Sequence, residues 1–580
     1  MAIESTGSQA IVNADGTTNR IWQSSYTEGV PGDIDLNKYD SLNHYFDIWV
    51  DKYRERPGFV SIGTEMSYDR LDKLVRRTAG WMRQQGIKKG DRVAIMLPNS
   101  LQYPICLFAT LRVGAIVVNV NPLYTAHELH HQLVDSGAET LFVMENFGST
   151  AEQALPGTAV KRVVLTQIGD LLSDGWINAK GRALNFVMRN VQKMVPKYKL
   201  PDAVWMRDVI IAGATNPVDE AVCVDRNDTA FLQYTGGTTG VAKGAVLSHG
   251  NILANCQQCM AFIEPQMSDE IETIVTPLPL YHIYSLTVNC LIFMAIGGRN
   301  ILIANPRDTK RVSMILKNEK FTAITSVNTL FASLLEDPDF VKRDFSKLKI
   351  SLAGGMALQR NVAETWKEVT GDSIAEGYGL TECSPVVCVQ PIDISQPRSA
   401  FTGTIGVPVP STDVGIRRED GSWGCVGERG ELCVRGPQVM QGYWMRPEET
   451  ALVLDSDGWL STGDVAVMDE LGFLKIVDRI KDLIIVSGFN VYPNEIEDAV
   501  AMHPDVLEVC AIGVPDNTTG EAVKIVVVPR SSQLTKEELK THCRQYLTGY
   551  KMPKLIEFRD EELPKTPVGK ILRREVRECC

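Results

Sequence analysis

The densest group of residues with chemical potential runs from Tyr234 to Gly244 and reads Tyr-Thr-Gly-Gly-Thr-Thr-Gly-Val-Ala-Lys-Gly. Glycines let backbone N–H groups turn toward an anion, the threonines add hydroxyl donors, and the lysine adds a positive charge. The stretch is not a Walker A loop, because Ala242 and not glycine precedes the lysine. It predicts a phosphate cradle, with an ordinary flexible turn as the alternative. The cradle residues are Thr235, Gly236, Gly237, Thr238, Thr239 and Lys243.

Four further motifs follow the cradle in order along the chain. They are Glu376-Gly-Tyr-Gly-Leu-Thr-Glu382, Ser461-Thr-Gly-Asp464, Asp478-Arg479 and Pro564-Lys-Thr-Pro-Val-Gly-Lys570. The ordered set of motifs resembles the adenylate-forming superfamily, which includes acyl-CoA synthetases, luciferases and the adenylation domains of peptide synthetases. The resemblance runs from about residue 40 to residue 575.

The resemblance implies that a carboxylate substrate attacks the α-phosphorus of ATP. Like charges oppose that approach, so cations and Mg²⁺ must converge on the site. By resemblance, Glu382 bridges to Mg²⁺, which prefers oxygen ligands, and Thr381 bonds the α-phosphate. Tyr378, between Gly377 and Gly379, would stack on adenine. A surface glutamate at a helix end is the alternative for Glu382.

Gly354 and Gly355 match the superfamily's backbone platform beside adenine and the acyl chain, although a strand-to-helix turn would also explain them. Asp464 is matched to the residue that accepts hydrogen bonds from the two ribose hydroxyls, and Arg479 to its partner at the nucleotide. The alternative for Asp464 is a carboxylate that caps a turn.

Two further residues carry catalytic predictions by resemblance. His282 matches an active-site histidine that borders the carboxylate site, whereas a lone histidine is usually structural. Lys570 matches the single catalytic lysine of the C-terminal domain, which reaches between the carboxylate and the α-phosphate; a solvated lysine near the end of the chain is the alternative.

The segment from Phe473 to Glu497 is most similar to bacterial long-chain fatty acyl-CoA synthetases, closer than to coumarate ligases or luciferases. This implies activation of long-chain fatty acids and transfer to CoA, whose pantetheine arm would pass Gly488 in the loop Ser487 to Asn490. Relatives pivot two residues past the arginine, here at Lys481. The alternatives are a fatty acyl-AMP ligase that loads a carrier protein, and a CoA ligase for medium-chain or aryl acids. A non-catalytic lipid-binding protein would be expected to lack Lys570, Glu382 or Asp464.

The stretch Lys180 to Lys199 holds six basic residues and no acidic one, with apolar residues at helical spacing. A basic amphipathic helix of this kind predicts contact with an anionic membrane surface, where free fatty acids arrive. A helix packed on the body or at a homodimer interface is the alternative.

The elements that must position these residues read as an α/β chain. Short apolar runs such as Val93 to Leu97 alternate with helix-like stretches from residue 91 and again after residue 225, which predicts doubly wound sheets. We expect a mobile tail over residues 1–40, a large domain over 41–478 with a β-rich part at 403–478, and a mobile α+β lid domain over 479–580.

Composition excludes several classes of protein. The formal charge of −12 disfavours nucleic acid as a partner. The thirteen cysteines are scattered, and Met1 to Arg20 lacks an apolar signal segment, so we expect a cytoplasmic protein, with peripheral membrane contact open. The lone Cys256-x-x-Cys259 is a weak metal or redox signal. No apolar run reaches the roughly 18 residues of a membrane span.

Overall fold

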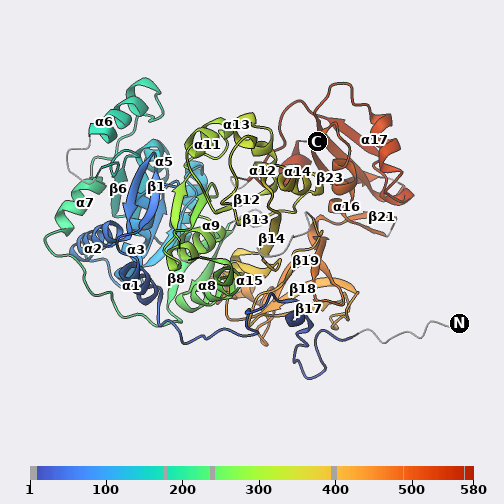
Figure 1. The fold of residues 1–580 in the computed structure, drawn as a ribbon, viewed down its shortest axis with the longest axis horizontal. Helices are drawn as coiled ribbons and strands as arrows, with labels where there is room; N and C mark the ends of the chain where they lie inside the picture. The colour runs from blue at the N-terminus through green and yellow to red at the C-terminus, as the bar shows by residue number, and fades with distance from the viewer. Residues whose placement is uncertain are drawn as a thin grey trace.

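The structure is a computed structural model of the 580-residue chain. It describes residues 9–173, 179–235, 242–268, 270–393, 401–487, 489–516, 518–566 and 569–579. Two large sheets lie toward one end and the centre of the long axis, and the C-terminal domain lies toward the other end with a smaller β-rich unit below it (Figure 1). The predicted α/β class is confirmed.

A seven-stranded sheet has the order β7-β6-β5-β3-β4-β8-β9 and is parallel except for the hairpin β8–β9. Most of its strands are apolar runs with little exposure on either face, as a parallel sheet covered by helices requires. Its strands are β3 (Arg92–Met96), β4 (Ile116–Asn119), β5 (Thr140–Met144), β6 (Arg162–Thr166), β7 (Val204–Trp205), β8 (Thr229–Thr235) and β9 (Lys243–Ser248). Helices near it are α2 (Tyr68–Gln84), α3 (Gln102–Arg112), α4 (Ala126–Ser136), α5 (Gly148–Ala154) and α7 (Met206–Gly213).

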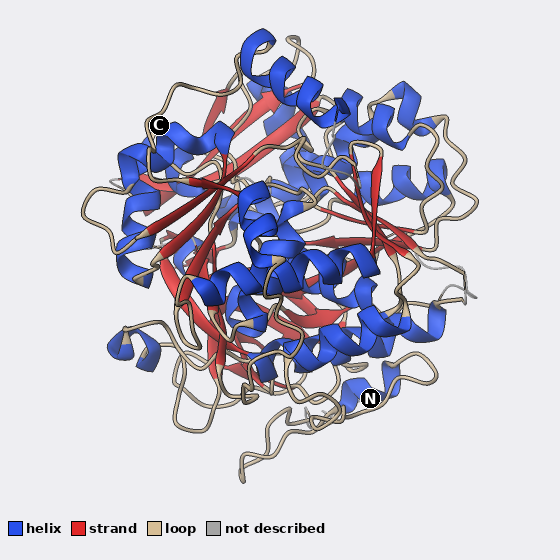
Figure 2. Ribbon diagram, turned by 90° about the vertical axis from the view of Figure 1, so that its left-hand side faces the viewer, coloured by secondary structure: helices blue, strands red, loops and turns tan. Residues whose placement is uncertain are grey.

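A nine-stranded sheet has the order β16-β15-β14-β13-β12-β10-β11-β1-β2, with a parallel centre and antiparallel edges. Figure 2 shows the two large sheets on either side of a central group of helices. Its strands are β1 (Pro57–Ser61), β2 (Thr64–Ser67), β10 (Thr273–Thr276), β11 (Arg299–Leu302), β12 (Ala323–Ser326), β13 (Ile350–Gly354), β14 (Ile374–Gly379), β15 (Val386–Val389) and β16 (Val407–Pro408). Associated helices are α1 (Leu42–Lys52), α8 (His249–Ile263), α9 (Ile283–Ser285), α10 (Phe293–Ala295), α11 (Thr309–Leu316), α12 (Asn328–Leu335), α13 (Pro338–Val341) and α14 (Arg360–Thr370).

The β-rich unit is a four-stranded antiparallel sheet in the order β17-β18-β19-β20, with α15 (Pro447–Ala451) beside it. The expectation of a mobile tail over residues 1–40 is wrong for residues 9–40. Trp22 is fully buried, and Arg20 pairs with Asp413 at 2.8 Å, so apolar residues hidden in a polar stretch hold this segment against the sheet. The strands are β17 (Asp413–Arg417), β18 (Arg429–Arg435), β19 (Leu460–Met468) and β20 (Leu474–Arg479).

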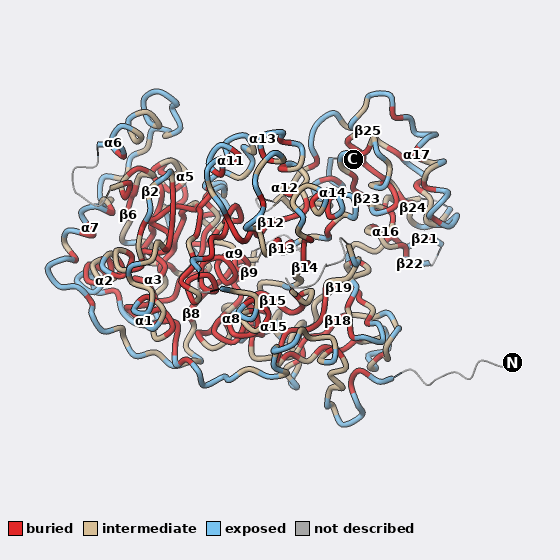
Figure 3. Tube along the Cα trace, in the orientation of Figure 1, coloured by how far each residue is buried: buried red, intermediate tan, exposed pale blue. Residues whose placement is uncertain are grey.

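The C-terminal domain has its own sheet and its own apolar core, which includes Ile484, Ile496 and Val523. Burial colouring separates this core from the cores of the two large sheets (Figure 3). A separate core allows a domain to move as one body. Its elements are β21 (Ile484–Val486), β22 (Phe489–Val491), α16 (Pro493–Ala501), β23 (Val506–Asp516), β24 (Gly520–Pro529), α17 (Lys536–Cys543), β25 (Leu555–Phe558) and α18 (Arg573–Glu578).

The basic stretch forms a shorter helix than expected over 180–199. Helix α6 (Ala179–Phe186) continues as one π turn, η3 (Val187–Val191), and then stops. Lys193 adopts a left-handed φ of 53°, and Pro196 lacks the N–H that a further turn would need. No helix within the described residues combines the length and apolar character that crossing a membrane requires.

Candidate functional site

The centre of the site is a buried carboxylate that two other elements reach. Asp464 on β19 is 5% exposed, accepts a 2.6 Å hydrogen bond from the Tyr378 hydroxyl of β14, and pairs with Arg479 at 3.0 Å. Register explains the ion pair, because Asp464 lies directly opposite Arg479 in the β19–β20 ladder. Burial, and next the Asp464 carboxylate, raise the pKa of Tyr378 far above its ordinary value, so the phenol stays a donor. The structure therefore brings these three predicted residues together.

Lys570 of the C-terminal domain lies within electrostatic range of the same carboxylate. Its pKa falls to about 7, chiefly because the ammonium is buried and next because the Arg479 guanidinium is near, while Asp464 opposes the shift. The turn that presents it is closed by the Thr566 N–H, which donates to the Lys570 carbonyl at 2.7 Å. Behind it, the Thr329 hydroxyl of α12 lies 3.5 Å from the Gly569 carbonyl oxygen. The small domain is thus docked with its predicted catalytic lysine over the nucleotide-side residues.

Glu382 lies on the helical turn η6 (Thr381–Cys383), half-buried, with Thr381 beside it. One of its oxygens accepts a 2.7 Å hydrogen bond from the Tyr443 hydroxyl. The Lys243 ammonium lies 5.2 Å from the centre of the Tyr443 ring and forms an ion pair with Glu449. Sequence reasoning missed Tyr443 and Glu449, since neither belongs to a motif with a spacing of its own.

The predicted phosphate cradle is only partly visible. Thr235 and Lys243 end β8 and start β9, and they face each other in the hairpin ladder. The intervening Gly236, Gly237, Thr238 and Thr239 lie outside the described residues, as does Gly488 of the predicted CoA loop. What the structure gives for the cradle is therefore its two ends, with a lysine at one of them.

The predicted glycine platform has little room for side chains. Gly354 pairs with Gly377 between β13 and β14, and a Cβ on Gly354 would meet the Tyr284 ring at 3.0 Å. A Cβ on Gly379 would lie 2.0 Å from the Pro385 carbonyl oxygen, so only glycine fits there. Gly355 follows the end of β13 with φ +82°, where a strand-to-helix turn also requires glycine. Close packing and backbone conformation thus require glycine at these positions, and this requirement is compatible with the predicted role beside the ligand.

His282 caps α9 and carries a neutral ring. Its Nδ1 accepts a 3.3 Å hydrogen bond from the Tyr284 N–H, and burial lowers its pKa to about 4. An Nδ1 that accepts leaves the proton on Nε2. The imidazole can therefore donate a hydrogen bond to a carboxylate without being charged.

The segment that joins the last large-domain strand to the C-terminal domain is tied by charge. Asp478 accepts from the backbone N–H of Arg479 at 2.7 Å and of Asn494 at 2.8 Å. Lys481 follows on the turn η7 (Ile480–Asp482), and its pKa is lowered by burial and by the nearby Arg479 guanidinium. From α18, Arg573 contacts both Asp482, at 3.3 Å, and Glu497, at 2.7 Å. The structure brings Lys481 next to the site without testing its role as a pivot.

The donor set fits a nucleotide with Mg²⁺. Lys243 lies beside Tyr443, the donor to Glu382. Arg479 and Lys570 supply positive charge near Asp464. Glu382 offers an oxygen ligand of the type Mg²⁺ prefers. Within the described residues, no group of three histidine, cysteine, aspartate or glutamate side chains could hold a metal alone. Mg²⁺ commonly uses one or two carboxylates together with substrate phosphates, so a single glutamate is compatible with it. Cys256 and Cys259 are buried free thiols on α8.

Two family models match the chain. One describes an AMP-binding enzyme and covers residues 46–444, and the other describes the AMP-binding enzyme C-terminal domain and covers residues 495–570. The chain belongs to the AMP-binding enzyme family. The predicted resemblance to adenylate-forming enzymes is confirmed.

Curated relatives of this family member align over nearly the whole chain. A long-chain-fatty-acid–CoA ligase of Yersinia pestis is 53% identical over 560 residues, with 96% of this chain and 98% of the relative covered. One of Haemophilus influenzae is 52% identical over 562 residues, with the same coverage. Among solved structures, ATP-bound MatB from Rhodopseudomonas palustris has a TM-score of 0.76 at 26% identity and covers 93% of this chain and 98% of its own. The anthranilate CoA ligase AuaEII, with anthranoyl-AMP, has a TM-score of 0.81 at 22% identity over 94% of this chain and 99% of its own, which shows likeness of fold.

Proposed function

We propose that this chain activates long-chain fatty acids with ATP and Mg²⁺ through acyl-AMP, and transfers the acyl group to CoA with release of AMP and pyrophosphate. The observation that carries this proposal is the Asp464–Arg479 ion pair together with the Lys570 turn, which touches the large domain through Gly569 and Thr329, because this contact joins the lid lysine to the domain of the residues predicted to hold the nucleotide. Relatives of 51–53% identity that are long-chain-fatty-acid–CoA ligases support the acyl class.

In the first step, the charges of the acid and the triphosphate must be offset. Lys570 supplies a cation from the lid side, and Lys243 supplies one at the end of the cradle. When Mg²⁺ is bound, it neutralises phosphate charge, and Glu382 is the residue that would hold it, steadied by the Tyr443 hydroxyl. Thr381, next to Glu382, would donate to the α-phosphate.

Asp464 would hold the ribose and Tyr378 would lie against adenine. Both Asp464 oxygens already have donors, from Tyr378 and Arg479, which fixes the carboxylate in one orientation. Gly354, Gly355, Gly377 and Gly379 would keep the adenine and acyl side free of side chains. His282, as a neutral Nε2–H donor, would orient the substrate carboxylate.

The second step needs a different face of the lid. We assign the lid to residues 479–580, the large domain to 41–478 and the pivot to Lys481, with Gly488 on the CoA path. In support, the four-stranded sheet ends at Arg479, and the lid has its own core. A hinge absorbs a large change of φ and ψ within a few residues, and Lys481 lies between the two cores.

Mass spectrometry of the products tests this function. The protein is incubated with ATP, Mg²⁺, CoA and a ladder of fatty and aryl acids, and we expect long-chain acyl-CoA and AMP. If acyl-AMP accumulates and its acyl group passes only to a carrier-protein thiol, the acceptor is the carrier protein and not CoA. Preference for medium-chain or aryl acids would overturn the long-chain assignment.

We also propose that α6 and the residues after it meet an anionic membrane surface. Phe186 and Val191 are 62% and 65% exposed, and Met194 is 52% exposed, amid basic residues. A homodimer interface through this face is the alternative. In a symmetric dimer the same basic patch would meet itself, and like charges would oppose the contact, which favours the membrane.

A further inference from the structure

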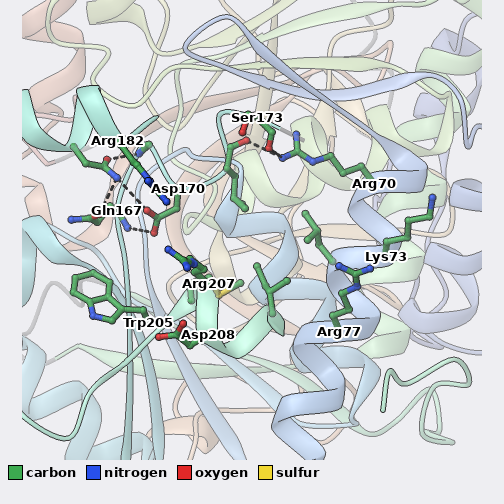
Figure 4. Close-up of a pocket in the computed structure, with 16 residues that line it drawn as sticks. Arg70, Lys73, Arg77, Gln167, Asp170, Ser173, Arg182, Trp205, Arg207 and Asp208 are labelled. Carbon is green, nitrogen blue, oxygen red and sulfur yellow. Dashed lines mark hydrogen bonds between the residues drawn. The ribbon is translucent and has the colours of Figure 1, made fainter. Parts of the chain in front are cut away.

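A cavity of 570 Å³ lies between α6, α2, the loop after β6 and the start of α7 (Figure 4). Arg70, Lys73 and Arg77 line it from one face of α2, where residues three, four and seven apart lie together. Arg182 enters from α6 and Arg207 from α7. The cavity therefore gathers five cationic side chains from three separate helices.

The cations outnumber the acidic groups. Asp170 and Asp208 are the carboxylates among the described lining residues. Asp170 is committed to the loop after β6, since it accepts from the Gln167 N–H at 2.8 Å, the Thr166 hydroxyl at 3.0 Å and the Asn185 amide at 3.2 Å. The cavity therefore concentrates positive charge locally, although the chain as a whole has a formal charge of −12.

Three of these cations have unused donors. Lys73 pairs with Asp69 at 2.5 Å, and Arg70 donates to the carbonyls of Leu171 and Ser173. The side chains of Arg77, Arg182 and Arg207, by contrast, make no hydrogen bond or ion pair anywhere in the described ranges. Three guanidinium groups with free N–H donors match the oxygens of a phosphate monoester or diester.

Exposed apolar side chains follow Arg182, a lining residue of this cationic cavity, along the chain. Phe186 lies four residues after Arg182 on α6, hence one turn along nearly the same face, and it is 62% exposed. Val191 and Met194, a few residues further along the chain, are also exposed. A ligand that offers a phosphate to the cavity and hydrocarbon to these side chains has the chemistry of a phospholipid.

We propose that this cavity binds the phosphate of an anionic phospholipid headgroup, while Phe186, Val191 and Met194 enter the acyl region beside it. The proposal rests on the membrane contact proposed above and adds a specific headgroup site to it. A free phosphate would satisfy the arginines but would leave these apolar side chains without a partner. Figure 1 places α6 at the opposite end of the long axis from the C-terminal domain, so a membrane held there leaves the lid clear to rotate.

The test compares two triple variants with equal change in charge. The cavity variant is Arg77→Gln, Arg182→Gln and Arg207→Gln. The control variant is Arg83→Gln, Lys197→Gln and Lys199→Gln, which removes three exposed charges from the same region and spares the cavity. Co-sedimentation is measured at physiological salt with vesicles of phosphatidylcholine alone and with about one-fifth phosphatidylglycerol. We expect the cavity variant to lose at least about tenfold more affinity for the anionic vesicles than the control loses.

Titrations with soluble phosphate compounds distinguish a lipid headgroup from a free phosphate as the ligand. Inorganic phosphate and glycerophosphoglycerol, which lack acyl chains, are titrated against the lipid-free protein by thermal shift. Binding of either as tight as that of the vesicles would overturn the lipid assignment and make the cavity a site for a soluble anion. Weak binding at millimolar concentration, lost in the cavity variant, supports a headgroup site that needs the exposed apolar side chains.

The other outcomes are distinct. Equal losses in the two triple variants would overturn the headgroup site and leave diffuse attraction to the membrane. Absence of vesicle binding by the unaltered protein would overturn the membrane contact as well. Thioester formation from a soluble short acid without vesicles should be unchanged in both variants, whose melting temperatures confirm folding. Absence of thioester formation by the unaltered protein from every acid of the ladder would instead count against the proposed ligase function.

Discussion

The pKa of Lys570 is lowered by its burial in the docked position of the lid. With its pKa near 7, the side chain is charged below that pH and loses its charge as the pH rises through it. We expect kcat/KM for ATP in pyrophosphate exchange to fall above about pH 7, since this ratio reports groups of the free enzyme. Bound triphosphate favours the ammonium, so the fall in kcat should come at higher pH. The arginine of Lys570→Arg stays charged, so any residual activity of this variant should lack the fall above pH 7. If the fall persists in the variant, another group causes it.

Tyr443 is the donor that fixes Glu382, and its removal should weaken use of Mg²⁺. Tyr443→Phe deletes one hydrogen bond to a charged group, a loss of about 1.5–3 kcal/mol. We expect the Mg²⁺ concentration for half-maximal adenylation to rise about tenfold or more. The control is Tyr546→Phe on the exposed surface of the lid, which should leave the Mg²⁺ dependence unchanged. Equal Mg²⁺ curves for both variants would show that Tyr443 does not support a metal ligand.

The residues that sequence reasoning found differ physically from those it missed. Asp464, Arg479 and Lys570 belong to ordered motifs; in the structure Asp464 and Arg479 form an ion pair, and Lys570 lies within electrostatic range of both. Tyr443 meets Glu382 across 61 positions and lies outside every motif, so only the folded chain reveals the contact. Arg479 was expected beside Asp464 by resemblance, and β-ladder register explains that pair, whereas the hydrogen bond from Tyr378 to Asp464 comes from another sheet and could not be read from spacing.

Among the elements, the turn before Lys570 is shaped for the docked lid. Gly569 has φ +84°, and a Cβ there would lie 2.5 Å from the Thr329 hydroxyl oxygen of the large domain. Gly569→Ala should therefore oppose docking and reduce pyrophosphate exchange about tenfold or more, with less effect on thioester formation from supplied acyl-AMP. Gly520→Ala in the same domain is the matched control, because Gly520 has a similar φ of +79° and a Cβ there would come no nearer than 3.8 Å to another atom. Equal rates of exchange in both variants would contradict this docking contact.

The turn η7 should act as the pivot if the lid rotates. Proline fixes φ near −65° and forbids part of the change a hinge must make. We expect Lys481→Pro to retain acyl-AMP formation, measured by pyrophosphate exchange, and to lose most thioester formation. Wild-type rates for both half-reactions, with normal thermal stability, would show that the pivot lies elsewhere. Loss of both with a lowered melting temperature would indicate general misfolding.

Helices and strands could be predicted where short apolar runs mark buried strands. The prediction failed where a single residue ends a helix early or packs into the core from a polar stretch. The buried strands β3, β5, β12 and β13 follow from short apolar runs between helices. The basic helix was predicted to reach residue 199 because its charge pattern continues, yet the backbone turns left-handed at Lys193. Likewise, Trp22 packs in the core from a stretch whose polar composition suggested a tail.

At the scale of the whole molecule, the lid is joined to the large domain by a mixture of weak and specific contacts. Arg530 pairs with Glu336 at 2.7 Å on exposed surface, and such pairs contribute about 0–1 kcal/mol. Thr329 approaches Gly569 at 3.5 Å, near the limit for a hydrogen bond. A lid with its own core and contacts of this kind can leave one pose for another without unfolding.

One measurement tests whether the two half-reactions use different faces of the lid. In Lys570→Ala, acyl-AMP formation from fatty acid, ATP and Mg²⁺ is compared with conversion of supplied acyl-AMP and CoA to thioester. We predict that adenylation falls by about 10²-fold or more, the scale of losing a transition-state charge partner, while the second half-reaction continues near the wild-type rate. Equal loss of both half-reactions in a variant with an unchanged melting temperature would contradict the account.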